Sequence, residues 1–305
     1  MTPHPRRAAL PRMLSHAPGE LTGGRLRRLA EGVGRVVYAS DHWVVKRERP
    51  ASEVIALIVV WKLLRGLAHI LPARLGERLL RRPSKLIRPL RLLMQAVVLV
   101  VPRSVWMMTH IGEVWRVHRT RDIRGARLAQ AHLTGTSLIP ERVTFPPARV
   151  SIGGWPGWLV VSEATERVEG TLYQRLADLA RSGHFEQFEQ WLDRFLDLRE
   201  AGWQLGLFSV DAHLKNYGVS GERVVLLDSG GLTDSWTEAE ARLASEEGVA
   251  EPHVRLGLGP LLDAHPATAG RFNARWRAAV NRAAVRRHWP VETAKRRYDG
   301  REAGV

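Results

Sequence analysis

Three polar side chains near the middle of the chain have the types and spacing that phosphoryl transfer requires. Asp211 and Asn216 lie five residues apart, and Asp228 ends the apolar run 224–227. Transfer of a γ-phosphoryl group needs a carboxylate beside the acceptor hydroxyl and two oxygen-bearing side chains that hold Mg²⁺ against the phosphate oxygens. Asp211 is the candidate for the first role, and Asn216 and Asp228 are the candidates for the second.

The elements around these residues are predicted to hold them in place. In residues 185–205, phenylalanine, tryptophan and leucine recur every three or four positions, which predicts a helix packed on a core that leads directly to the Asp211 loop. Residues 224–227 are typical of a short buried strand. Because Gly230 and Gly231 follow shortly after Asp228, its carboxylate can approach a metal closely.

A second group of candidate residues lies near the amino terminus. Residues 36–40 and 43–46 are rich in β-branched and aromatic side chains and are joined by Asp-His, which predicts a β-hairpin. Lys46 ends the second strand. Gly32 and Gly34 precede the first strand and form part of a glycine-rich loop, although a single Gly-x-Gly is a motif of low specificity.

The motif Asp-x-His-x-x-Asn from Asp211, followed by Asp-Ser-Gly from Asp228, resembles the catalytic loop and metal-binding segment of the protein-kinase-like superfamily. It is nearest to the bacterial branches that act on small molecules and lipids: lipopolysaccharide-core (Kdo) kinases, aminoglycoside and choline phosphotransferases, and the UbiB-like group. The resemblance extends over residues 31–235 and is sharp only between residues 185 and 231.

This resemblance implies an enzyme that uses ATP and Mg²⁺, and it implies a role for each candidate residue. The loop aspartate would position the acceptor hydroxyl or act as base, and the asparagine and second aspartate would bind magnesium. The lysine and the glycine loop would contact the phosphates of the nucleotide. The implied site is therefore catalytic Asp211, metal-binding Asn216 and Asp228, and nucleotide-binding Lys46, Gly32 and Gly34.

The chain departs from the family pattern in two places. Ser209 and Val210 replace the His or His-Gly that usually precedes the loop aspartate, and Val37 replaces the third glycine of the glycine-rich loop. A membrane-associated pseudokinase that binds nucleotide and acts as a scaffold therefore stays open as the alternative. The family lysine also requires an acidic partner, for which three candidates stay open: Glu53, Glu113 and Asp122.

Composition limits the other possibilities. The 305 residues are 45% hydrophobic and 25% charged, which is typical of a globular protein. The absence of cysteine excludes disulfides and cysteine metal sites, and the histidines lack the spacing of a zinc site. Residues 1–30 are predicted to be a basic tail broken by proline, with no apolar core for a signal peptide, which predicts a cytoplasmic location.

The net charge of +15 is concentrated in one segment. Residues 62–119 contain twelve Lys and Arg against two acids, a net charge of +10. The same region has apolar runs at residues 54–61 and 92–102, each shorter than the roughly 18 to 20 residues that cross a bilayer. Residues 54–108 are therefore predicted to be an insertion that seats the protein on anionic lipid. Buried helices of an enlarged lobe are the alternative, and nucleic acid is disfavoured because no recognised binding module accompanies the charge.

Together these features predict an α+β, bilobal, protein-kinase-like fold. Residues 31–160 would form a small β-rich lobe that carries the helical basic and apolar insertion, and residues 161–305 would form a mainly helical lobe with the catalytic loop. The predicted function is ATP- and Mg²⁺-dependent phosphotransfer to a hydroxyl of a sugar or lipid-linked, lipopolysaccharide-like acceptor. The predicted location is the cytoplasmic face of the inner membrane, peripherally bound.

Overall fold

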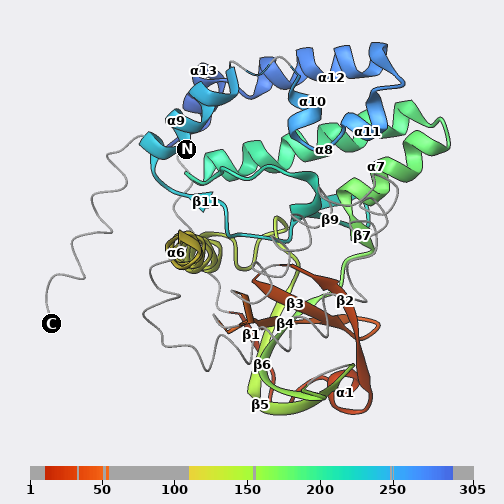
Figure 1. The fold of residues 1–305 in the computed structure, drawn as a ribbon, viewed down its shortest axis with the longest axis vertical. Coiled ribbons are helices and arrows are strands. Elements are labelled where there is room, and N and C mark those ends of the chain that lie inside the picture. Colours follow the sequence, from red (N-terminus) through yellow and green to blue (C-terminus); the bar gives the residue numbers. More distant parts are fainter. Residues whose placement is uncertain are drawn as a thin grey trace, which may run out of the picture. The chain divides into compact units, whose positions relative to one another are not determined.

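The computed structural model describes residues 11–32, 34–50, 53–54, 110–153, 156–247, 249 and 251–290, and its chain folds into two compact units (Figure 1). One unit, here called the β-unit, comprises Met13–Thr120 and Val143–Thr165. The other, the helical unit, comprises Met1–Arg12, Arg121–Arg142 and Glu166–Val305. The protein is therefore a mixed α+β protein, as predicted.

The β-unit is built on one six-stranded sheet in the order β1-β5-β2-β3-β4-β6. Because β5 also pairs with β6, strands β2 to β6 close into a ring (Figure 1). Strand β2 is antiparallel to β3 and parallel to β5, and β3 is antiparallel to β4. Its elements are β1 (Arg12–Met13), α1 (Gly19–Thr22), β2 (Arg25–Glu31), β3 (Arg35–Ala39), β4 (Trp43–Glu48), β5 (Arg142–Ile152) and β6 (Trp158–Glu166).

The interior of the β-unit is filled by one face of each strand. Val36 and Tyr38 in β3 and Val45 in β4 are buried, while alternate residues point outward, as the period of two in a strand requires. The predicted hairpin over residues 36–46 is thus confirmed. The β-unit begins earlier than residue 31, however, because β1, α1 and most of β2 lie within the segment predicted to be a basic tail.

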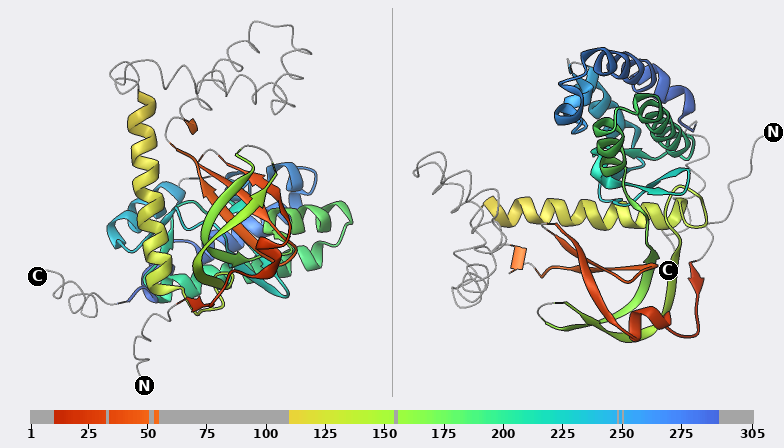
Figure 2. Two further views of the ribbon diagram at one scale, coloured as in Figure 1. Left: turned by 90° about the horizontal axis from the view of Figure 1, so that it is seen from below. Right: turned by 90° about the vertical axis from the view of Figure 1, so that its right-hand side faces the viewer.

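Helix α6 (His110–His132) is a single continuous helix, seen from the side in both views of Figure 2 and end-on in Figure 1. The sequence pattern predicts a helix only over residues 123–133, so the observed helix begins thirteen residues earlier and ends one residue earlier. Residues up to Thr120 are counted with the β-unit and residues from Arg121 onward with the helical unit.

The helical unit packs around α8, as the sequence pattern predicts. Its aromatic and aliphatic stripe is buried in one core with the strands that carry the candidate site. The elements are β7 (Gly170–Thr171), α7 (Leu172–Arg181), α8 (Phe185–Gln204), β8 (Phe208–Ser209), the 3₁₀ turn η1 (Leu214–Asn216), β9 (Tyr217–Ser220), β10 (Arg223–Leu226), β11 (Leu232–Thr233), α9 (Trp236–Glu247), α10 (Pro252–Arg255), α11 (Gly259–Leu262), α12 (Pro266–Ala279) and α13 (Arg282–His288).

The sequence pattern predicts a small helix over residues 254–264 and a basic amphipathic helix over residues 271–287, and the structure divides each into two. The first is interrupted at Gly257, whose φ of 85° lies in the left-handed region that ends a right-handed helix. The second is broken after Ala279. There Asn281 starts α13 by accepting a hydrogen bond from the Ala284 N–H at 2.9 Å.

The predicted membrane insertion, residues 54–108, lies outside the described residues except for Val54, which is buried. Among the described residues, no helix is long and apolar enough to cross a membrane.

Candidate functional site

The loop that carries Asp211 is held in place by hydrogen bonds at both ends. Strand β8 pairs with β11, and the N–H of Val210 donates to the carbonyl of Gly231 at 2.8 Å. The hydroxyl of Ser209 donates to the Asp211 carbonyl at 3.0 Å, and the His213 N–H donates to Asp211 Oδ1 at 3.3 Å. Ser209, which replaces the expected histidine, thus orders the loop through a different contact.

Glycine at position 231 is required for this arrangement. A Cβ added to Gly231 would lie 3.0 Å from both the Cβ and the N of Asp211, closer than side chains normally approach. The backbone after Asp228 can therefore lie directly against the catalytic-loop candidate only because residue 231 has no side chain.

Asn216 and Asp228 are brought together by the backbone. The carbonyl of Asn216 accepts hydrogen bonds from the N–H groups of Leu227 and Asp228, at 2.9 and 3.2 Å. The Asn216 side chain donates from Nδ2 to the Asp211 carbonyl at 3.4 Å, and Asp228 Oδ1 accepts from the Gly230 N–H at 3.0 Å. The structure therefore joins Asp211, Asn216 and Asp228 in one site within the helical unit.

The donor set of this site suits magnesium. A carboxylate and an amide oxygen are hard oxygen ligands, and Mg²⁺ commonly takes one or two such protein ligands and completes its octahedron with water and phosphate. Because Asp211 and Asp228 are exposed and Asn216 is half-buried, a hydrated ion can reach them. Among the described residues there is no group of three or more His, Cys, Asp or Glu arranged to hold a metal alone.

Helix α6 adds a third carboxylate to the site. Gly125 lies so close to Ser229 that a Cβ on Gly125 would clash with the Ser229 carbonyl. Likewise, a Cβ on Gly230 would clash with the Asp122 carboxylate and would lie 3.2 Å from Asp228 Oδ1. Asp122 and Asp228 therefore border the same small space. The sequence offered Asp122 only as a partner for the lysine and did not indicate this neighbour.

Arg124 fixes α6 to the segment after the site. Its guanidinium donates to Glu238 at 2.8 Å and to Asp234 at 3.0 Å. Hydrogen bonds from Thr233 and from Arg124 hold the pKa of Glu238 below its ordinary value. Glu238 therefore stays ionised at neutral pH and keeps this connection.

A pocket of about 70 Å³ opens beside Asp211 and His213. Its wall includes Arg242 and Arg255, which both approach Glu246 Oε1, at 3.1 and 3.8 Å. Together with Asp211, the wall therefore carries two positive and two negative side chains. The sequence did not indicate Arg242, Glu246 and Arg255, because nothing in the local pattern of α9 and α10 distinguishes them from surface charges.

The nucleotide-site candidates lie in the β-unit. Lys46 is exposed on β4, where its backbone is opposite Val37 of β3. Gly32 and Gly34 lie in the turn from β2 to β3, and the Gly32 N–H donates to the Arg35 carbonyl at 2.8 Å. The structure therefore places the glycine turn directly before the predicted hairpin of β3 and β4, and it adds the unpredicted strand β2 in front of the turn.

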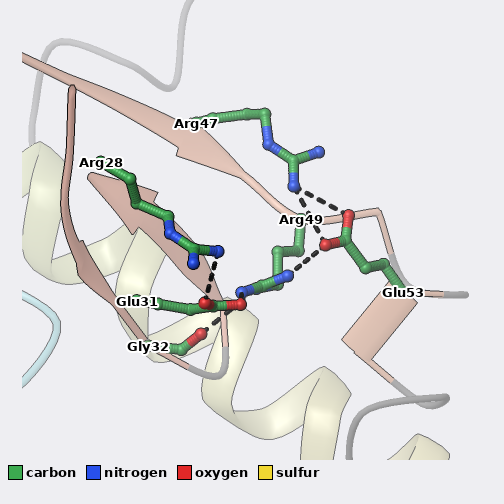
Figure 3. Close-up of polar contacts among 6 residues, drawn as sticks. All are labelled: Arg28, Glu31, Gly32, Arg47, Arg49 and Glu53. Atoms are coloured by element: carbon green, nitrogen blue, oxygen red, sulfur yellow. Dashed lines mark hydrogen bonds and ion pairs between the residues drawn. The ribbon is translucent and has the colours of Figure 1, made fainter. Parts of the chain in front are cut away.

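A buried arginine fixes this glycine turn, as Figure 3 shows. Arg49 is 1% exposed; its Nε donates to the Gly32 carbonyl at 3.2 Å and its backbone N–H donates to the Gly34 carbonyl at 2.8 Å. The guanidinium also makes short ion pairs with Glu31 and Glu53. Arg49 therefore holds both sides of the turn.

Two further arginines complete the network. Arg47 pairs with Glu53 at 2.9 Å, and Arg28 pairs with Glu31 at 2.9 Å (Figure 3). Glu53, one of the three acids predicted as partners of Lys46, thus pairs with Arg47 and Arg49. The side chain of Glu113 lies outside the described residues.

Comparison of the chain with protein-family models, curated proteins and solved structures gives no match.

Proposed function

We propose that the protein is an ATP- and Mg²⁺-dependent phosphotransferase with a bilobal, protein-kinase-like fold. The acceptor is a hydroxyl of a sugar or lipid-linked, lipopolysaccharide-like molecule at the cytoplasmic membrane face. The observation that carries the proposal is the joining of Asp211, Asn216 and Asp228, from two separate segments, by backbone hydrogen bonds.

The acceptor would enter beside Asp211. An exposed carboxylate next to a pocket can accept a hydrogen bond from an incoming hydroxyl and orient its oxygen toward the phosphoryl group. The guanidinium groups of Arg242 and Arg255 in the pocket wall can donate hydrogen bonds to oxygen atoms of the acceptor.

Separate residues would hold the metal and the nucleotide. Asn216 and Asp228 would supply the protein ligands of Mg²⁺, which when bound neutralises the charge that develops on the phosphate oxygens. Lys46 would bind the α- and β-phosphates, and the Gly32–Gly34 turn would cover them. Its fixation by Arg49 supports this role, because a phosphate-binding backbone is most effective when it is ordered before the ligand arrives.

Substitution of Asp211 tests the proposal. Asp211→Asn preserves the shape but removes the charge, so turnover should fall by roughly 10²-fold or more while the affinity for Mg·ATP stays near that of wild type. Transfer of γ-³²P from ATP to a native membrane extract would provide the assay. Asp178→Asn, which changes an exposed aspartate of α7, is the matched control and should leave turnover unchanged.

The same assay separates the enzyme from a pseudokinase. A wild-type protein that binds Mg·ATP but labels no acceptor in any membrane extract would support a nucleotide-binding scaffold. Turnover retained in Asp211→Asn would contradict the catalytic assignment directly.

A further inference from the structure

Arg199 of α8 is a buried cation that has no ion-pair partner among the described residues. It is 4% exposed, and none of its three guanidinium nitrogens has a hydrogen-bond partner in the part of the chain that the structure describes. Its charge lies among aromatic rings: 5.2 Å from the centres of Phe208 and Trp276 and 5.8 Å from the centre of Trp203.

The aromatic rings compensate this charge only in part. Cation–π attraction offsets some of the desolvation cost, but the ring faces leave the five N–H donors of the guanidinium without lone-pair acceptors. Arginine does not lose its proton in proteins, so it cannot escape the cost by becoming neutral. Buried charges in stable proteins are paired, and therefore a compensating group is expected beside Arg199.

The space for such a group is present. Arg199 lines a cavity of about 40 Å³, together with Ser209, Tyr217 and mainly leucine side chains. A water molecule needs about 10–15 Å³ of such space, so the cavity has room for roughly three particles of that size. Neither a nucleotide nor a sugar phosphate would fit.

A second polar group faces the same cavity without a partner. Tyr217 is 2% exposed, and its hydroxyl lies near Arg199 and Ser209 but makes no hydrogen bond of good geometry with any described residue. Burial raises the pKa of Tyr217 above its ordinary value, while the charge of Arg199 and the approach of Ser209 act against this rise. The hydroxyl therefore stays protonated and available as a donor.

We propose that this cavity binds a small inorganic anion of the chloride class, held by the guanidinium of Arg199 and the hydroxyl of Tyr217. Both groups can donate hydrogen bonds, and the guanidinium has no acceptor atom. The lining residues also carry a net positive charge, so an anion compensates them better than water alone. Ser209 separates the anion from the active-site loop, because its hydroxyl donates to the Asp211 carbonyl. The inference stands whether or not the protein transfers phosphate.

Wild-type protein tests the proposal without any substitution. Crystals soaked in bromide should show an anomalous peak within hydrogen-bond distance of Arg199 and Tyr217. The melting temperature should rise by a few degrees with chloride, and saturate, compared with gluconate at the same ionic strength. No bromide peak in the cavity, or identical melting in the two salts, would overturn it.

Two substitutions locate the effect. Arg199→Met keeps an unbranched apolar stem and removes the charge, so the variant should fold and lose both the bromide site and the chloride dependence of melting. Tyr217→Phe keeps the ring and should reduce the apparent affinity for chloride several-fold. Persistence of the full chloride dependence in Arg199→Met would refute the assignment.

Arg194→Met is the matched control for a change on the same helix. Arg194 also lies over a tryptophan, 4.5 Å from the ring of Trp191, but it pairs with Glu222 and its side chain is 32% exposed. Its chloride dependence should equal that of wild type. If Arg199→Met does not fold, the bromide and melting results on wild type still decide the question.

Discussion

At the scale of single residues, the candidate site is defined by carboxylates with different tasks. Asp211 lies beside a pocket, Asp228 accepts a hydrogen bond from its own turn, and Asp122 approaches from a helix. Like charges in one small space repel one another, so a bound divalent cation would relieve this repulsion. Substitution of one of these carboxylates should therefore weaken metal binding without unfolding the protein.

Asp228→Asn should therefore abolish Mg²⁺-dependent nucleotide binding while leaving the protein folded. The substituted residue is exposed and contributes no packed core surface, so the melting temperature should change little. Calorimetric titration with ATP, with and without Mg²⁺, measures the effect. Asp178→Asn should bind as wild type, and undiminished Mg·ATP affinity in a folded Asp228→Asn variant would refute the metal assignment.

The buried Arg49 makes a different prediction, about stability. Arg49→Met removes the ion pairs of Arg49 with Glu31 and Glu53 and the side-chain hydrogen bond to the Gly32 carbonyl, while the backbone bond to Gly34 remains. Unfolding should become easier by about 3 kcal/mol, the lower end for breaking a buried ion pair. Denaturant titration gives the value. The control is Arg27→Met, whose ion pair is exposed and should cost less than about 1 kcal/mol.

A loss of stability in Arg49→Met as small as that in Arg27→Met would contradict this prediction. It would mean that the ion pairs of Arg49 do not stabilise the glycine turn.

At the scale of elements, the contact of α6 with the Asp228 segment depends on Gly125. Gly125→Ala places a methyl group against the Ser229 carbonyl, so the helix or the loop must move, which should cost roughly 1–3 kcal/mol of stability and weaken Mg·nucleotide binding. Thermal melting and calorimetry would measure both effects.

Gly270 in α12 provides the opposite control. A Cβ there meets nothing within 4 Å, so Gly270→Ala should stabilise the protein by roughly 0.5–1 kcal/mol through helix propensity alone. A stabilising Gly125→Ala would show that α6 does not press on the loop.

The elements also show what local sequence patterns can and cannot predict. Periodicity predicted α8 closely, because its aromatic stripe repeats over five turns, and alternation predicted the hairpin of β3 and β4. Strand β2 escaped prediction because six of its seven residues are exposed and its stability comes from β3 and from a parallel pairing with the distant β5. Such long-range pairings leave no local signal.

Some residues of the candidate site could likewise be predicted from local sequence, and others could not. The spacing of Asp211, Asn216 and Asp228 was sufficient to predict that they lie together, because a single short β-hairpin separates them. The positions of Asp122 and of the pocket arginines were not predictable, since helices far apart in the sequence bring them there. A glycine in the middle of an otherwise good helix, Gly125, was the one available signal of close packing.

At the scale of the whole molecule, the net charge of +15 bears on which partners the protein binds and not on which fold it adopts. If residues 54–108 seat the protein on anionic lipid, binding to vesicles should rise with the anionic-lipid fraction and fall with salt, since surface attraction decays over about 8 Å at physiological ionic strength. Co-sedimentation measures this. Wild-type protein that stays in the supernatant at low salt would contradict the membrane assignment.

Substitutions in this segment separate its two possible roles. Replacing Arg78, Arg81, Arg82 and Arg88 with Gln should weaken vesicle binding strongly, and replacing Trp61 and Trp106 should lower affinity even in high salt. If the segment is instead packed in the β-unit, the tryptophan variant should lose thermal stability and neither variant should change vesicle binding.

Each of the two units is formed from segments that are not consecutive in the chain, and this affects how the protein folds during synthesis on the ribosome. The ring of strands in the β-unit closes only through β5 and β6, which follow α6 in the chain. A nascent chain that has not yet exposed residues 142–166 thus carries β2, β3 and β4 with open edges, and such edges readily pair with other chains. Because the amino-terminal strands cannot be completed as they emerge, chaperone occupancy should be highest during that interval and fall once β6 has left the exit tunnel.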